Sequence, residues 1–379
     1  MKKLRILLTA GGTGGHIYPI LAIAGQLRIL AVPKGIDLEL RYFGAPGPYQ
    51  DILESNGIKV SKILSSKLRR YFSLKNFLDA PKFVFSFFQA LFKIFWFMPE
   101  AVFSKGGPGA LAVVMASRFY RLPIVIHESD AVPGLTNRLS ARSAKIIFTA
   151  FKKAAQYFPP EKIILVGNPI RTNILENIPD RESAKKAFGF NPTEPVILVI
   201  GGSQGALRIN NFIADNLGEI LDSVQVIHQA GPANFPEVKK ETDFLLRSLG
   251  DFYKNRYYLV GYLEEIKDLR AAFAAADLVL SRAGSGAIFE IAAFSKPAIL
   301  IPLEEAAGDH QRMNAYEYAE TGAAIVIEEN NLKPGIFLLQ VQKILAEPEL
   351  KAKMSQAAKN FSKPEAAKII AEEILKLAS

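Results

Sequence analysis

The residues with the clearest chemical potential form a glycine-rich stretch near the start of the chain, Gly11-Gly12-Thr13-Gly14-Gly15-His16. It follows a short apolar run and precedes a run with helical periodicity, which predicts a strand, a tight turn and a helix. Glycines let the backbone approach a ligand closely, and the following helix N-terminus offers N–H groups to a phosphate or diphosphate. His16 can take up a proton near neutral pH. The spacing differs from the dinucleotide fingerprint G-x-G-x-x-G, so it does not predict a nicotinamide cofactor.

Two further glycine loops follow apolar runs in the same way. One is Ser104-Lys105-Gly106-Gly107-Pro108-Gly109, and the other is Gly201-Gly202-Ser203-Gln204-Gly205-Ala206. Each precedes a helical pattern and could supply N–H donors for a diphosphate, although each alone is also a common turn. The first two loops lie in the same half of the chain, and together they are more informative than either alone.

Polar residues stand at the ends of other apolar runs, where α/β proteins place ligand contacts. His127-Glu128-Ser129-Asp130 is one such group, for which a helix-capping role is equally compatible with the pattern. Glu290 follows a glycine turn that begins at Ser281, and could accept hydrogen bonds from a ribose diol or interact with a helix dipole. Gln311 offers both a donor and an acceptor, which suits sugar hydroxyls.

The elements that must position these residues alternate between short apolar strands and helices. Such continuous apolar strands are typical of parallel sheets covered on both faces, so we predict an α/β fold with doubly wound sheets. The predicted strands are 4–10, 38–43, 60–64, 101–104, 123–127, 145–149 and 163–167 in the first half, and 196–200, 224–228, 257–260, 277–281, 298–301 and 323–327 in the second. The tail from 350 to 379 is predicted to be helical.

Length and charge indicate two domains. A chain of 379 residues exceeds one ordinary core, and Gly167-Asn168-Pro169-Ile170-Arg171 reads as a hinge. Residues 1–166 hold 23 Lys and Arg against 9 Asp and Glu, whereas residues 167–379 hold 23 against 28. A basic half favours contact with a polyanion or an anionic membrane, although solubility alone could explain it. The absence of cysteine excludes disulfides, thiolate metal sites and a cysteine nucleophile.

Residues 81–98 are almost wholly apolar and rich in aromatic side chains, with basic residues (Lys67, Arg69, Arg70 and Lys75) leading in. Read as a helix, the segment places Lys82, Ser86, Gln89 and Lys93 on one narrow stripe. One side of this helix must pack in the protein core, but aromatic side chains lie on nearly every side of the helix. We therefore predict a peripheral membrane contact through Lys82, Phe85, Lys93 and Trp96, with plain core as the alternative. No run is long enough to suggest a spanning helix.

Taken together, these motifs resemble the MurG family, the peripheral membrane glycosyltransferases of bacterial cell-wall synthesis. The resemblance covers essentially the whole chain and implies the GT-B architecture, two Rossmann-like domains facing a cleft. It implies a domain of residues 1–166 plus 360–379 that faces acceptor and membrane, and a UDP-sugar-binding domain of residues 167–359. The implied reaction moves N-acetylglucosamine from UDP-N-acetylglucosamine (UDP-GlcNAc) to undecaprenyl-diphosphate-linked muramyl-pentapeptide (lipid I), giving lipid II with inversion, on the cytoplasmic face of the membrane. It implies no cofactor, metal or nucleic acid, and membership of a cell-wall synthesis complex.

The resemblance also implies roles for individual residues. Those expected to bind UDP-GlcNAc are Thr13, Gly14, Gly15, Asp130, Arg171, Ser203, Leu263, Ser285, Gly286, Ala287, Ile288, Phe289, Glu290 and Gln311. Those expected to bind the acceptor diphosphate are Gly11, Gly12, Gly106, Gly107 and Gly109. His16 is the first candidate for the general base, and Glu128 is the second candidate. The chain departs from the family at Ser129-Asp130, where many members carry an amide that contacts the sugar.

Three other functions remain open at this point. A diacylglycerol-type transferase would share the donor motifs and the apolar basic segment. A UDP-sugar epimerase would share the fold, but such enzymes lack a membrane segment. A scaffold that binds nucleotide-sugar without turnover would not need His16.

Overall fold

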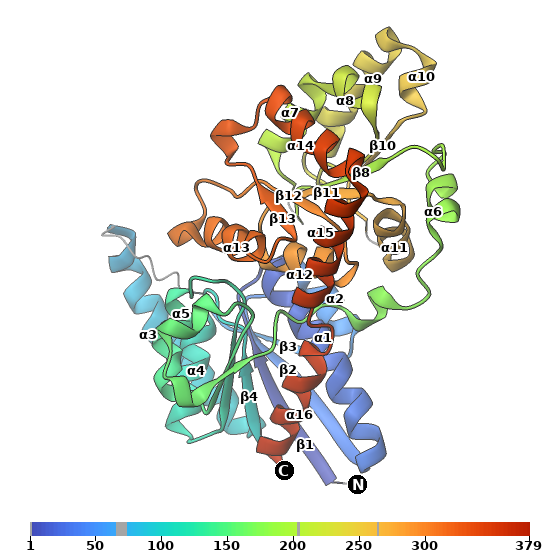
Figure 1. Ribbon diagram of the computed structural model, residues 1–379. Helices are drawn as coiled ribbons and strands as arrows, with labels where there is room; N and C mark the ends of the chain where they lie inside the picture. Colours follow the sequence, from blue (N-terminus) through green and yellow to red (C-terminus); the bar gives the residue numbers. More distant parts are fainter. Residues whose placement is uncertain (1, 66–73, 203–204, 264) are drawn as a thin grey trace. The chain divides into compact units, whose positions relative to one another are not determined.

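The structure, a computed structural model, describes residues 2–65, 74–202, 205–263 and 265–379, with the side chains of 74–80 and 172 also outside the description. Contacts divide the chain into two compact units (Figure 1). The first unit comprises Met1–Arg171 with Lys363–Ser379, and the second comprises Thr172–Ser362. The boundaries predicted from the sequence are 166/167 and 359/360, whereas those of the structure are 171/172 and 362/363. The hinge motif 167–171 therefore belongs to the first unit.

A sheet of seven parallel strands forms the centre of the first unit, in the order β3-β2-β1-β4-β5-β6-β7. The strands are β1 (Lys2–Thr9), β2 (Ile36–Gly44), β3 (Lys59–Lys62), β4 (Ala101–Ser104), β5 (Ile124–Glu128), β6 (Ile146–Thr149) and β7 (Ile163–Leu165). Every residue of β4 and β5 is buried, which is why these strands read as unbroken apolar runs.

Helices cover both faces of this sheet. They are α1 (Gly14–Ala31), α2 (Gln50–Ser55), α3 (Leu74–Phe97), α4 (Ala110–Phe119), α5 (Leu135–Ser140) and α16 (Ala366–Ala378). One core cluster joins α1 and α16 to the sheet through side chains such as Ile23 and Ile370. A second joins α3 and α4 to it through Ile94 and Val113. The last helix of the chain is thus part of the first unit.

A second parallel sheet, of six strands, forms the centre of the second unit in the order β10-β9-β8-β11-β12-β13. The strands are β8 (Val196–Ile200), β9 (Gln225–Gln229), β10 (Tyr257–Val260), β11 (Leu278–Ser281), β12 (Ala298–Leu300) and β13 (Ala324–Val326). Its helices are α6 (Arg181–Ala187), α7 (Leu207–Asp215), α8 (Leu217–Ser223), α9 (Phe235–Leu249), α10 (Asp251–Lys254), α11 (Ile266–Ala275), α12 (Ser285–Ala293), α13 (His310–Ala319), α14 (Pro334–Ala346) and α15 (Pro348–Phe361). Residues of α7, α8, α14 and α15 share one core cluster with the strands.

Asp277, just before β11, ties three segments of the second unit together. Its carboxylate lies 2.5 Å from Arg181 Nη2, 3.2 Å from Lys185 Nζ and 2.5 Å from Lys351 Nζ. Burial alone would raise the pKa of Asp277, but the hydrogen bonds from Arg181 and Lys351 and the neighbouring positive charges hold it well below its usual range. The side chain is therefore ionised at neutral pH and fixes α6 and α15 against the sheet.

Among the described residues, one helical segment is long and apolar enough to cross a membrane, 14–34, which contains α1. Half of that segment is buried within the protein, and Ile17, Ile20, Ile23 and Leu27 are fully buried in the first unit. The apolar composition of α1 is accounted for by its position in this core.

Candidate active site

The two glycine loops of the first unit pack directly on one another. One loop follows β1 and the other follows β4. Because these strands are neighbours in the sheet and parallel, their carboxyl ends place the two loops side by side. The N–H of Gly11 donates to the carbonyl of Gly106 at 2.8 Å, and the N–H of Lys105 donates to the carbonyl of Thr9 at 2.9 Å. The loops predicted separately from the sequence therefore form one surface, which we call the double loop (residues 10–16 and 105–109).

The double loop leaves no room for side chains at its centre. Gly107 has φ of +86°, and a Cβ there would lie 2.8 Å from the nitrogen of Gly11 and 2.9 Å from His16 Nε2. A Cβ at Gly12 would lie 2.5 Å from the carbonyl oxygen of Ala45. Gly106 and Gly109 also have positive φ, of +79° and +88°. Glycine at these positions is required by the backbone and by the close approach of the two loops.

His16 lies in the first turn of α1 with its ring half-buried beside the double loop. Its Nδ1 is 2.7 Å from the hydroxyl of Thr13. Burial and the positive charge of Lys105 lower the pKa of His16 to about 4, although the charge of Asp130 opposes them. The imidazole is therefore neutral at pH 7, as a proton acceptor must be.

Glu128 ends β5 and is buried, with 3% of its surface exposed. Both its carboxylate oxygens accept hydrogen bonds from the loop that follows. Asp130, in the same loop, is half-buried. His127, beside Glu128, is fully buried, and its Nε2 lies 2.9 Å from the carbonyl of Gly167.

Arg171 belongs to the first unit and not, as predicted from the sequence, to the second. Its guanidinium carbon lies 5.0 Å from the centre of the Tyr18 ring, on α1. The hinge motif contacts the first unit at both of its ends, since the carbonyl of Gly167 lies 2.9 Å from Nε2 of His127 on β5 and Arg171 lies over Tyr18. The boundary between the two units therefore lies after Arg171 rather than before Gly167.

In the second unit, the loop Gly201–Ala206 connects β8 to α7 as predicted. Ser203, the predicted phosphate contact, lies outside the described residues. Gly205 has φ of +80°, and a Cβ there would lie 2.2 Å from the carbonyl oxygen of Ala230. This loop thus requires glycine for the same reason as the double loop.

The turn before α12 brings six predicted site residues to one helix N-terminus. Ser285 begins α12, and its buried hydroxyl has no hydrogen-bond partner within the described part of the chain. The side chains of Ile288 and Phe289 are buried in the core, so a ligand could meet only their backbone groups. Gly286, Ala287 and Glu290 are half-buried on the same helix.

Two other predicted donor contacts already have partners within the second unit. Gln311, in the first turn of α13, accepts a hydrogen bond from the N–H of Leu303 at 3.0 Å. The N–H of Leu263 donates to Gln229 Oε1 at 3.1 Å. The side-chain NH₂ of Gln311 and the carbonyl of Leu263 are therefore the groups to consider for a ligand.

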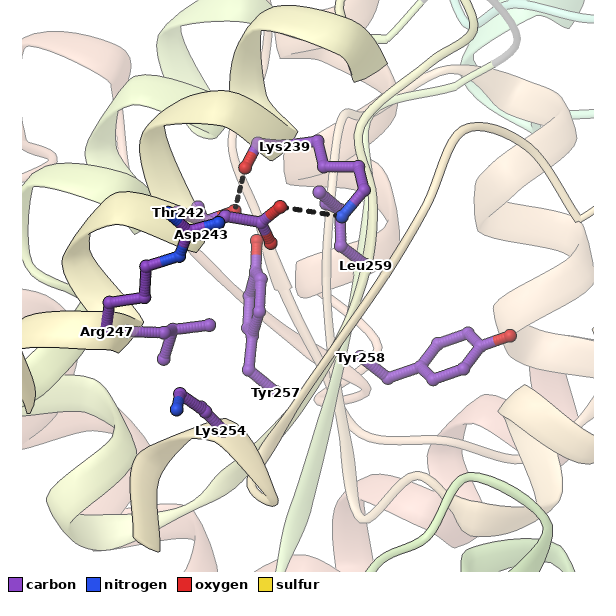
Figure 2. Close-up of a pocket in the computed structure, with 9 residues that line it drawn as sticks. Lys239, Thr242, Asp243, Arg247, Lys254, Tyr257, Tyr258 and Leu259 are labelled. Atoms are coloured by element: carbon purple, nitrogen blue, oxygen red, sulfur yellow. Dashed lines mark hydrogen bonds and ion pairs between the residues drawn. The ribbon is translucent and has the colours of Figure 1, made fainter. Parts of the chain in front are cut away.

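A cavity of about 440 Å³ lies between α9 and β10. Figure 2 shows Tyr257 within it and an ion pair between Lys239 and Asp243 on its rim. None of the predicted site residues that the structure describes lines this cavity.

The membrane segment predicted from the sequence is helix α3, and its polar stripe faces the protein. Ser86 donates to the carbonyl of Leu64 at 2.6 Å, and Lys93 Nζ donates to the carbonyl of Lys62 at 3.0 Å. The side of α3 that faces away from the buried Ala90, Ile94 and Phe97 carries exposed apolar side chains, and the neighbouring helix α4 adds two more. They are Val84, Phe85, Phe88, Phe92, Phe95 and Trp96 of α3, and Met115 and Phe119 of α4. We call these eight residues the aromatic face. Trp96 is 71% exposed, so plain core does not account for this surface.

Lys82 is exposed, at the point of α3 where the described side chains begin. The basic residues Lys67, Arg69 and Arg70 lie outside the described residues, as does the side chain of Lys75.

Comparison with known proteins identifies the family. Residues 6–149 match the Glycosyltransferase family 28 N-terminal domain, and residues 196–370 match its C-terminal domain. The chain is 36% identical over 347 residues to the UDP-N-acetylglucosamine--N-acetylmuramyl-(pentapeptide) pyrophosphoryl-undecaprenol N-acetylglucosamine transferase of Clostridium kluyveri, covering 91% of each chain. The chain belongs to the MurG family of glycosyltransferases.

Solved structures agree with this assignment. The MurG of Acinetobacter baumannii has a TM-score of 0.73 and 25% identity, covering 98% of this chain and 99% of that one. A UDP-GlcNAc 2-epimerase from Neisseria meningitidis shares the fold alone, with a TM-score of 0.64 and 17% identity over 98% of this chain and all of that one. Two Rossmann-like parallel-sheet units of the GT-B fold, predicted for the MurG family, are thus confirmed.

Lys105 is a residue whose importance the sequence did not reveal. It stands near the start of the second glycine loop, yet it is only 2% exposed, and its Nζ has no hydrogen-bond partner among the residues that the structure describes. Burial lowers the pKa of Lys105 to about 8, while the charges of Glu128 and Asp130 raise it. A lysine directly between a buried strand and two glycines is a signal that could have pointed to it.

We predict that Gly107→Ala destabilises the protein by about 2 kcal/mol or more, because alanine at positive φ is strained and its methyl group would meet Gly11 and His16. Gly134→Ala is the matched control. Gly134 has φ of −63°, and a Cβ there meets nothing within 4 Å. Urea unfolding followed by circular dichroism measures both. Equal stability of the two variants would contradict the close packing of the double loop.

Proposed function

We propose that this protein transfers N-acetylglucosamine from UDP-GlcNAc to the muramyl sugar of undecaprenyl-diphosphate-linked muramyl-pentapeptide, forming lipid II with inversion. The observation that carries the proposal is the match over 91% of both chains to a transferase whose name states this reaction. The double loop and the helix N-termini of the second unit supply the groups that such a reaction needs.

The donor is proposed to bind mainly on the second unit. N–H groups at the start of α12 and the hydroxyl of Ser285 suit a nucleotide, and Glu290 suits the ribose diol. Gln311 would contact the sugar through its NH₂ group, and Leu263 the uracil through its carbonyl. Ser203, Arg171 and Asp130, together with Thr13, Gly14 and Gly15, complete the proposed donor contacts.

The acceptor diphosphate is proposed to bind on the double loop. Its glycines (Gly11, Gly12, Gly106, Gly107 and Gly109) let phosphate oxygens approach backbone N–H groups, and the N-termini of α1 and α4 point their dipoles toward them. The departing UDP would be stabilised by helix N-termini and by Arg171.

His16 is proposed as the general base. Inversion requires that the attacking hydroxyl lose its proton as the bond to UDP breaks on the opposite side of the sugar carbon. The hydroxyl of Thr13 holds the His16 ring through Nδ1, which leaves Nε2, beside Gly107, to accept that proton.

The aromatic face is proposed to dock the protein on the cytoplasmic surface of an anionic membrane. Exposed Phe and Trp side chains suit the interfacial region of a bilayer, and the basic charge of the first half suits anionic headgroups. A membrane-bound protein would meet its lipid-linked acceptor without extracting it from the bilayer.

The proposed reaction is tested by incubating the purified protein with labelled UDP-GlcNAc and a short-chain lipid I analogue. We expect transfer of the labelled sugar to the analogue and none to diacylglycerol. UDP binding without transfer to lipid I would overturn the proposal, and transfer to diacylglycerol instead would favour that class of enzyme.

His16→Ala is expected to lower the turnover number by roughly 10²- to 10⁴-fold, the usual contribution of a general base, and to leave UDP affinity unchanged. Because the pKa of His16 is about 4, its protonation should not limit the rate between pH 6 and 8. Steady-state kinetics and UDP calorimetry measure both quantities. A turnover number equal to that of the wild type would remove His16 from this role.

Phe85→Ser combined with Trp96→Ser should weaken binding to vesicles containing anionic lipid by roughly tenfold or more, because two large exposed apolar side chains are lost. The control is Phe244→Ser with Phe252→Ser, two aromatic side chains of the second unit that are 73% and 59% exposed. Vesicle sedimentation compares the pairs. Undiminished binding of the first pair would show that the aromatic face is not the contact surface.

A further inference from the structure

The carboxylate of Glu128 holds together the loop that follows β5. Oε1 accepts the N–H of Asp130 at 2.9 Å, and Oε2 accepts the N–H of Gly134 at 3.1 Å. Oε2 also accepts the side-chain Nδ2 of Asn137, on α5, at 3.0 Å. The same Asn137 NH₂ group lies 3.1 Å from the carbonyl of His127. One buried side chain therefore fixes the loop at its start, middle and end.

This arrangement does not suit a proton acceptor. Both oxygens of Glu128 are engaged and the residue is only 3% exposed, so a substrate hydroxyl could reach it only by displacing loop contacts. It suits a structural anchor, since a carboxylate accepts N–H groups at two oxygens, whereas an amide of the same shape has only one acceptor oxygen.

The countercharge to Glu128 comes from Lys105. No ion pair with direct contact joins the two among the described residues, but the charge of each favours ionisation of the other. Lys105 lies in the double loop, immediately after β4, and β4 is the neighbour of β5 in the sheet. A single buried cation thus connects the double loop to the anchor of the next loop.

The anchored loop carries Asp130, and the charge of Asp130 acts on His16. The titratable groups that act on Glu128 are Asp130 in the loop and Lys105 just after β4. The charge of Lys105 also acts on His127 of β5 and on His16 of α1. Burial and the charge of Asp130 raise the pKa of Glu128 to about 7, while hydrogen bonds and Lys105 oppose this rise. Whatever holds the loop therefore also sets the surroundings of the proposed base.

We propose that Glu128 is a positioning residue which, paired with the buried ammonium of Lys105, fixes residues 128–137 and so holds Asp130 at its place beside His16. This assignment rests on the proposed function for its effect on catalysis. The structural part does not, because the loop and its hydrogen bonds can be measured without substrate.

The first test is amide hydrogen exchange at Asp130 and Gly134 in the free protein, read by NMR. Glu128→Gln keeps the size of the side chain but leaves at least one N–H donor without an acceptor, so we expect roughly tenfold faster exchange at these amides. Glu161→Gln, which alters an exposed residue of the same unit, should leave them unchanged. Unchanged exchange in Glu128→Gln would overturn the proposal.

The second test follows the pKa of His16 by NMR. Because the charge of Asp130 raises this pKa, Asp130→Asn should lower it, and Glu128→Gln should lower it in the same direction by displacing Asp130. A general loss of stability would not produce this shift in a folded protein. No shift in Glu128→Gln, with a clear shift in Asp130→Asn, would show that Glu128 does not position Asp130.

The third test removes the countercharge. Lys105→Met should raise the pKa of the Glu128 carboxyl, measured from its carbon chemical shift, whereas Lys145→Met, an exposed lysine of the same unit, should not. Should Lys105→Met fail to fold, the amide-exchange test at Asp130 and Gly134 in Glu128→Gln decides.

Kinetics separate the proposal from the function on which it rests. If the protein transfers N-acetylglucosamine to lipid I, Glu128→Gln should lower the turnover number and leave UDP affinity unchanged. Absence of transfer in the wild type would overturn the proposed function while the exchange and pKa results still stand. Reduced turnover with unchanged amide exchange would instead make Glu128 a catalytic group.

Discussion

The hydrogen bond between the N–H of Gly11 and the carbonyl of Gly106 is the contact on which the rest of the first unit's site depends. It forms only because β1 and β4 are neighbours in the sheet and because no Cβ separates the loops that follow them. With the loops in contact, His16 meets Gly107 and Lys105 lies beneath the loop surface. The proposed base, the anion-binding backbone and the buried cation are consequences of this single close approach.

The second unit uses the same physical device with different neighbours. A Cβ at Gly205 would lie 2.2 Å from the carbonyl oxygen of Ala230, just after β9, and a Cβ at Gly107 would lie 2.8 Å from the nitrogen of Gly11. In both units a glycine lets another backbone segment pack where a side chain would otherwise lie. The N–H groups at the helix N-terminus therefore remain accessible to a ligand. The chemical difference comes from the surroundings, since the loop of the first unit has a histidine and a buried lysine beside it.

Every strand predicted from an apolar run is present, because strands buried on both faces leave a local signature in the sequence. The glycine loops were predictable for a similar reason. The direction in which α3 faces was not, because its polar stripe bonds to the carbonyls of Lys62 and Leu64, which periodicity cannot reveal. Two other features could not be predicted, namely that hydrogen bonds occupy the carboxylate oxygens of Glu128 and that Arg171 belongs to the first unit. Both depend on the path of a loop, which residue types do not determine.

The position of α16 has a consequence for how the protein is made. Ile370, Ile374 and other residues of this helix fill the core of the first unit against α1, yet they follow the entire second unit in the chain. At about 5–20 residues per second, a ribosome needs on the order of ten to forty seconds to synthesise the intervening segment. During that interval the nascent first unit exposes the apolar groove that α16 later fills, in a polypeptide that already carries the aromatic face. Early attachment to a bilayer or a chaperone would shield both surfaces until synthesis reaches the final helix.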